Sequence, residues 1–212
     1  MKKNMKNNVK LMDLILPNKK INFFITTIMV LGIISGSIFL MMSSETDKVN
    51  VITQIETFFK NISNNSIDNG LALKNSLVIN YLFVGCIWIL GFSMIGIVIN
   101  IFLTYVKGFL VGFSLASIFL TYKSKGILAC ILYTIPVQII NIMVVIILSI
   151  YSVMFSLNLL EIINSKNNKT KLMIKKYFII LILCVILSFI SSLLEVYMFP
   201  DLLKLVVKYY IK

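Results

Sequence analysis

The sequence predicts an all-α protein, a polytopic membrane helix bundle with five transmembrane spans, a broken helix at Pro136 and short amphipathic flanking helices. Three observations lead to this prediction. Hydrophobic residues fill 59% of the 212 positions and charged residues only 13%, whereas about 25% of a soluble domain is charged. The mean hydropathy is +0.97. The charges gather in short clusters, and the apolar runs between them can cross a bilayer core of about 30 Å.

The basic N-terminal segment 1–20 carries six lysines and precedes the first predicted span, 21–42. This apolar run is longer than that of a secretory signal, which has about 7–15 residues, and no small-residue cleavage site follows it. We therefore expect an uncleaved span. Its lysine-rich side should face the cytoplasm, as the positive-inside rule states.

Four further apolar runs predict the remaining spans. They cover 77–103, 108–122, 137–160 and 177–199. Lys107 is expected to end the second span, because a charge at membrane depth is costly. Pro136 is expected to divide the long uncharged run 126–160, since proline lacks an N–H and clashes with the preceding helical turn.

The third run, 108–122, is short and allows two topologies, a crossing or a re-entrant pair with 126–135. A crossing puts the N-terminus and the basic loop 161–176 on the same side, whereas re-entry exports that loop with its five lysines. The positive-inside rule favours the crossing. Residues 21–200 should thus form one five-span bundle, with a cytoplasmic N-terminus, the loop 43–76 outside and the C-terminus outside.

Two segments beside the spans have apolar residues at helical spacing, which predicts amphipathic helices. In the loop 43–76 these are Val51, Ile52, Ile55, Phe58, Phe59 and Ile62. That face is a candidate partner-binding surface, or it lies on the membrane surface or against the bundle. The segment 201–212 repeats the pattern and predicts an interfacial C-terminal helix that is too short to span.

Small residues recur at four-residue spacing in two spans. Gly32 and Gly36 lie in the first, and Gly108, Gly112 and Ala116 in the third. Residues four apart share one helix face, and small ones let a second backbone approach closely. We predict helix packing at these positions. The alternative is chance, because glycine is common in membrane helices.

Glu195 is an acidic residue inside the otherwise apolar fifth run. An ionisable group at membrane depth usually faces the bundle interior or water and has a partner. Glu195 is therefore either an intramembrane carboxylate that pins the bundle or binds a partner, or a group near enough to the interface to be solvated.

The residues that carry enzyme chemistry are scarce. The chain has neither His nor Arg, and its three cysteines lie in apolar runs without CxxC spacing. It contains no Ser–His–Asp set, no HExxH and no glycine-rich phosphate loop. We expect no enzyme, no metal and no cofactor. The lysines flank apolar runs, so membrane lipids are the expected partners and nucleic acid is not.

Four stretches of the sequence resemble one family. They are KGFLVGF at 107–113, IPVQ at 135–138, FSLNLLEI at 155–162 and LEVYMFPDLL at 194–203. With the order and lengths of the apolar segments, they are similar to the stage II sporulation protein M family. The resemblance covers nearly the whole chain.

The resemblance implies a non-enzymatic scaffold of the engulfment machinery in endospore formation. Such a protein recruits and holds the peptidoglycan-degrading stage II sporulation proteins D and P. It would lie in the bacterial cell membrane, at the septal, engulfing membrane of the mother cell. The alternative is a small membrane permease or export component. A permease should depend on groups at membrane depth such as Glu195, Gln138 or Asn141.

Overall fold

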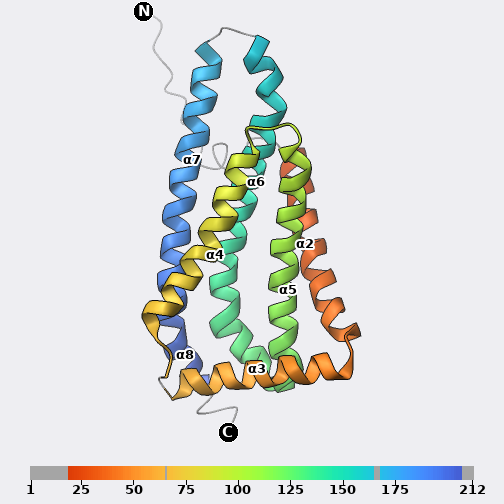
Figure 1. The fold of residues 1–212 in the computed structure, drawn as a ribbon, viewed down its shortest axis with the longest axis vertical. Coiled ribbons are helices and arrows are strands. Elements are labelled where there is room, and N and C mark those ends of the chain that lie inside the picture. Colours follow the sequence, from red (N-terminus) through yellow and green to blue (C-terminus); the bar gives the residue numbers. More distant parts are fainter. Residues whose placement is uncertain (1–18, 65, 165–167, 207–212) are drawn as a thin grey trace, which may run out of the picture.

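The computed structural model describes residues 19–64, 66–164 and 168–206. The basic segment up to residue 18, residues 165–167 of the basic loop and the end of the predicted C-terminal helix lie outside these ranges. The described chain is helical, with no strand. Long helices stand side by side, and α3 (Glu45–Ser63) lies across one end of them (Figure 1). We call this the α3 end of the bundle.

Within the described ranges, five helical segments are long and apolar enough to cross a membrane, which confirms the predicted five-span bundle. They are Lys19–Met42 (α2), Asn69–Leu90 (α4), Gly96–Lys123 within α5 (Gly96–Ala129), Ile135–Leu159 within α6 (Ile135–Asn164), and Met173–Lys204, which runs from α7 (Asn168–Leu193) through a π-helical turn (Leu194–Met198) into α8 (Phe199–Val206).

The boundary between the second and third spans differs from the predicted one. The chain turns at 91–95, inside the predicted span 77–103, and Lys107 lies within α5. Glycines bracket this turn, and a Cβ on Gly96 would collide with the backbone of Leu90. Lys107 was expected to end a span because of its charge. It is accommodated inside one because its ammonium lies 5.0 Å from the centre of the Phe83 ring, a favourable cation–π contact.

The predicted break at Pro136 is spread over two places. The chain reverses at Lys123, where φ is 50° and ψ is −129°, a backbone conformation that residues other than glycine rarely adopt. A π-helical turn, Cys130–Thr134, then precedes α6. Pro136 occupies the first turn of α6, where its missing N–H leaves no hydrogen bond unmade.

The small residues of the first and third spans lie at one contact between α2 and α5. A Cβ on any of four glycines would meet backbone atoms of the facing helix within 3.4 Å. These glycines are Gly32 and Gly36 of α2 and Gly108 and Gly112 of α5. Ser37 Oγ donates a hydrogen bond of 3.1 Å to the Gly112 carbonyl at the same contact, and Ala116 is buried further along α5.

An aromatic cluster joins the helices near the end of the bundle opposite α3. Tyr177 of α7 is 1% exposed, and its ring stacks on Phe155 with centroids 4.6 Å apart and an interplanar angle of 7°. Its hydroxyl donates a 2.7 Å hydrogen bond to the Trp88 carbonyl of α4. One side chain therefore ties α4, α6 and α7 together.

The amphipathic helix predicted in the loop 43–76 is α3, and it begins where Ser44 Oγ accepts a hydrogen bond from the Asp47 N–H. Its apolar face packs against the bundle, since Phe59 and Ile62 are each 2% exposed. They contact residues of α5, of the π-turn Cys130–Thr134 and of α8. Three other residues of the predicted partner-binding face, Val51, Ile52 and Ile55, are half-buried. Phe58 remains 38% exposed.

Candidate functional site: a polar cleft among the spans

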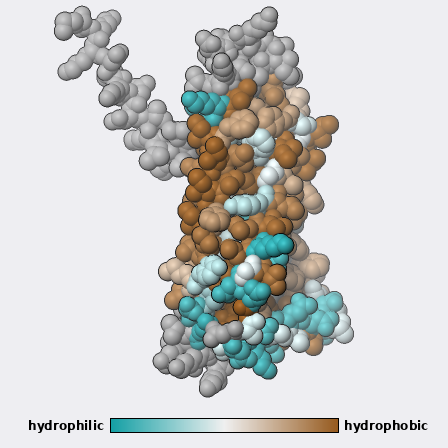
Figure 2. Space-filling model, turned by 60° about the vertical axis from the view of Figure 1, so that its left-hand side comes forward, coloured by the Kyte–Doolittle hydropathy of each residue, from teal (hydrophilic) through white to brown (hydrophobic). Residues whose placement is uncertain are grey.

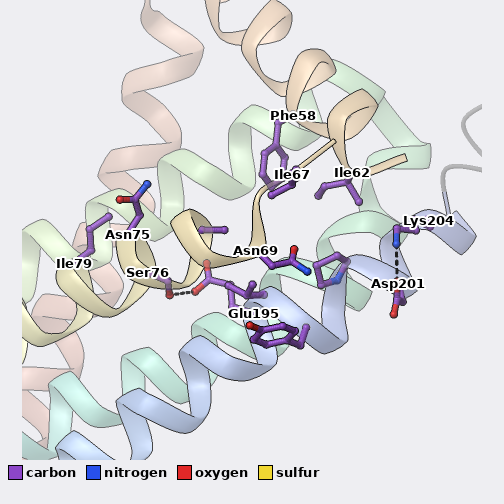
Figure 3. A pocket seen from close by; sticks show the side chains of 14 residues that line it. Phe58, Ile62, Ile67, Asn69, Asn75, Ser76, Ile79, Glu195, Asp201 and Lys204 are labelled. Atoms are coloured by element: carbon purple, nitrogen blue, oxygen red, sulfur yellow. Dashed lines mark hydrogen bonds and ion pairs between the residues drawn. The ribbon is translucent and has the colours of Figure 1, made fainter. Parts of the chain in front are cut away.

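Glu195 lies in the π-helical turn Leu194–Met198 and has a partner in α4. Ser76 Oγ donates a 2.6 Å hydrogen bond to Glu195 Oε2 (Figure 3). Ser192 Oγ lies 3.0 Å from Ser76 Oγ and accepts a 3.0 Å hydrogen bond from Asn80 Nδ2. The carboxylate is thus the end of a polar chain that links α4 to the last span.

A proline explains why Glu195 stands in a π-helical turn. Pro200 follows two residues after the turn ends, and a proline clashes with the carbonyl four residues before it. The wider turn relieves that clash and shifts the side chains before it. The π-turn Cys130–Thr134 stands in the same relation to Pro136. Such turns are frequent at functional sites.

A cleft of about 560 Å³ opens beside Glu195 at the α3 end. Its walls come from α3, α4, the π-turn Leu194–Met198 and α8, and Figure 3 shows their side chains converging on it. Lining residues include Phe58, Ile62, Asn69, Ser76, Ile79 and Glu195. The ion pair between Lys204 Nζ and Asp201 Oδ1, 2.7 Å long, lies at the cleft.

A second cavity of about 230 Å³, which we call the chamber, continues from the cleft into the bundle. Both are lined by Ser76, Ile79 and Glu195. The chamber adds polar residues of α5 and α6, namely Lys107, Ser114, Gln138 and Asn141. Figure 2 shows hydrophilic residues gathered at the α3 end and a strip of them rising through the hydrophobic belt.

The chamber holds charged and amide groups that are almost enclosed by protein. Lys107 is 6% exposed and Asn141 5% exposed. Glu195, which carries the opposite charge, lines the same cavity. Within the described part of the chain, however, no ion pair of 4.0 Å or less joins the two. Both charges therefore border the same space without touching.

The polar side chains of the site can bind a polar group. No cluster of three or more His, Cys, Asp or Glu side chains occurs among residues 19–64, 66–164 and 168–206. Of the sequence-predicted site residues, Glu195, Phe58 and Ile62 line the cleft, whereas the four glycines pack elsewhere. Lys107, Ser76 and Asn80 were missed. Lys107 itself could have indicated the site, because it is a charged residue within a long apolar region. It was instead interpreted as the end of a span.

A comparison with protein families places the chain beside a known family. The model described as stage II sporulation protein M matches residues 25–200, which is most of the chain and runs from α2 into α8. Neither the curated proteins nor the solved structures give a match.

Proposed function

Because the chain belongs to the stage II sporulation protein M family, and is thus a multi-pass membrane protein of sporulation, we propose that it is a non-enzymatic scaffold of the engulfment machinery. In this proposal it recruits and holds the peptidoglycan-degrading stage II sporulation proteins D and P at the septal membrane. The family match over residues 25–200 is the observation that carries the proposal. That family is not known as a family of enzymes.

We place the docking of these hydrolases at the α3 end, around Phe58. Most of the apolar face of α3 is turned toward the bundle, but Phe58 is a large aromatic side chain, 38% exposed, at the mouth of the cleft. A half-exposed aromatic residue beside an apolar-walled cleft is typical of the few residues that dominate binding energy at interfaces.

Phe58→Glu is expected to weaken hydrolase binding by about tenfold or more, because truncating or charging such an anchor costs about 2 kcal/mol or more. The measurement is co-purification of proteins D and P with the full-length chain from detergent-solubilised membranes. Val49→Glu is the matched control, since Val49 is an exposed apolar residue, 58% exposed, on the same helix.

Two results would count against this part of the proposal. If the Phe58→Glu variant retains both hydrolases, the docking site is elsewhere. If the unaltered chain retains neither of them, the scaffold proposal itself is wrong.

The proposed orientation places the α3 end outside the cell. Cysteine introduced at Glu45, an exposed residue at the start of α3, should react with a membrane-impermeant maleimide applied to intact cells. Cys130 and Cys184 are buried, and burial raises the pKa of the Cys130 thiol, leaving little reactive thiolate. Cys86 is half-buried within the membrane-spanning helix α4, so labelling of the unaltered chain gives the background. Labelling that appears only after the cells are opened would mean that the α3 end faces the cytoplasm and that the proposed orientation is wrong.

The permease remains a second candidate function, and the chamber is the observation that favours it. Glu195, Gln138 and Asn141, the groups on which a permease should depend, all line this one cavity. A flux assay with the purified chain in liposomes separates the two candidates. A scaffold gives no flux, whereas a permease gives flux that Gln138→Leu reduces.

A further inference from the structure

The chamber contains unsatisfied hydrogen-bonding groups in addition to its charges. In the described part of the chain, no hydrogen bond involves the side chains of Lys107, Gln138 or Asn141. Gln138 Oε1 is fully buried without a partner. Buried polar side chains nearly always have hydrogen-bond partners. Two buried side chains, Lys107 and Asn141, and the buried oxygen of Gln138 surround one cavity without hydrogen-bond partners. We take this as an indication that something polar binds between them.

The charges of the chamber restrict what that polar group can be. An isolated charge at membrane depth is costly unless it is paired. A simple anion would pair with Lys107 but would be repelled by Glu195. A simple cation would pair with Glu195 but would be repelled by Lys107. A ligand with one charge of each sign satisfies both residues and adds no net charge to the membrane interior.

The chamber also has a side that faces the bilayer. Ile79 of α4 is 54% exposed and Leu110 of α5 is 45% exposed, and both line the chamber. Because they lie within membrane-spanning segments, the surface outside them is lipid. A molecule with apolar chains can place its polar end in the chamber and leave the chains in the bilayer.

We propose that the chamber binds a small zwitterion, in which a phosphate or carboxylate and a primary ammonium are a few bonds apart. Lys107 Nζ donates to the anionic group, with the amide groups of Asn141 and Gln138 beside it. The ammonium donates to Glu195, which Ser76 holds in place. The exposed Ile79 and Leu110 favour the headgroup of an ethanolamine phospholipid. A free zwitterion entering through the cleft has the same chemistry.

Ligand binding to the purified full-length chain tests this inference. The probe is short-chain phosphatidylethanolamine added to the protein in detergent, with binding followed by native mass spectrometry and by the shift in Tm. Lys107→Met and Glu195→Gln should each weaken binding by about tenfold or more, because each removes a charged hydrogen-bond partner. Lys60→Met and Glu56→Gln, exposed residues of α3, are the matched controls and should bind normally.

Related lipids and free zwitterions identify the ligand chemistry. Phosphatidylcholine has no ammonium N–H for Glu195, and phosphatidylglycerol has no cation, so both should bind at least about tenfold more weakly. Free phosphoethanolamine or glycine that binds where the lipid does not would assign the chamber to a soluble zwitterion. Asn141→Leu keeps both charges and should weaken binding several-fold, which provides a test if Lys107→Met does not fold.

The proposal is wrong if phosphatidylglycerol or phosphatidylcholine binds as well as phosphatidylethanolamine, if Lys107→Met and Glu195→Gln bind undiminished, or if no zwitterion binds. The inference concerns binding alone, so these results are independent of whether hydrolases co-purify with the chain.

Discussion

Gly36→Val is expected to lower the free energy of unfolding by about 3 kcal/mol, which is the upper end of the usual cost of overpacking a tight interior. A Cβ at Gly36 would collide with the backbone of Phe109 in the facing helix α5. Backbone atoms cannot move aside as a flexible side chain can, so α2 and α5 would have to separate. Denaturant unfolding of the full-length protein in micelles measures the change.

Gly85→Val is the control for this experiment. Gly85 lies in α4, another membrane-spanning helix, and a Cβ there has no heavy atom within 4 Å. The same substitution should therefore leave the free energy of unfolding within about 0.5 kcal/mol of the parent value. Equal losses for Gly36→Val and Gly85→Val would mean that the α2–α5 contact is not the reason.

Tyr177→Ala is expected to destabilise the bundle by about 3 kcal/mol, at the lower end of the cost of truncating a buried aromatic side chain. Tyr177 is 1% exposed, stacks on Phe155 and donates a hydrogen bond to the Trp88 carbonyl. Truncation removes these contacts and leaves a cavity between three spans. Thermal unfolding in detergent measures the loss as a lower Tm.

Two variants separate the causes of this loss. Tyr177→Phe keeps the ring and removes only the hydroxyl, so it should cost about 1 kcal/mol. Phe178→Ala removes the neighbouring ring, which is 44% exposed on a membrane-spanning helix, and should cost less than Tyr177→Ala. If Phe178→Ala proves as harmful as Tyr177→Ala, the aromatic cluster does not join the helices as described.

The five spans and the helical class could be predicted because they depend on local composition. Lysines flank most apolar runs, and a run of sufficient length without charge has few alternatives to a membrane helix. The π-turns also have a local cause in Pro136 and Pro200. Residues close in sequence determine each of these features.

The turn at 91–95 could not be predicted in the same way. The segment around it is uncharged, so hydropathy alone gave one long span that ended at Lys107. The turn depends on Gly91 and Gly96 and on the contact of Gly91 with Tyr177, far away in the chain. Lys107 in turn depends on the Phe83 ring of the neighbouring helix for its place inside a span.

The hydrogen-bond partner of Glu195 could not be predicted from the sequence, because it too depends on residues far apart in the chain. Ser76, which donates to its carboxylate, lies 119 positions earlier in the chain. Many serines of the spans could have served equally well by spacing. Only the arrangement of α4 beside the last span selects Ser76, and with it the cleft and the chamber.

The attachment of α3 has a mechanical consequence. The helix lies between α2 and α4 in the chain. Phe59 and Ile62 pack its side against α5, the π-turn Cys130–Thr134 and α8. A pull on α3 is therefore shared among several anchored helices and acts largely as shear on buried contacts. A flexible loop under the same tension would stretch first. A partner bound to α3, as proposed above, would therefore pull on a helix with buried anchors and not on a free loop.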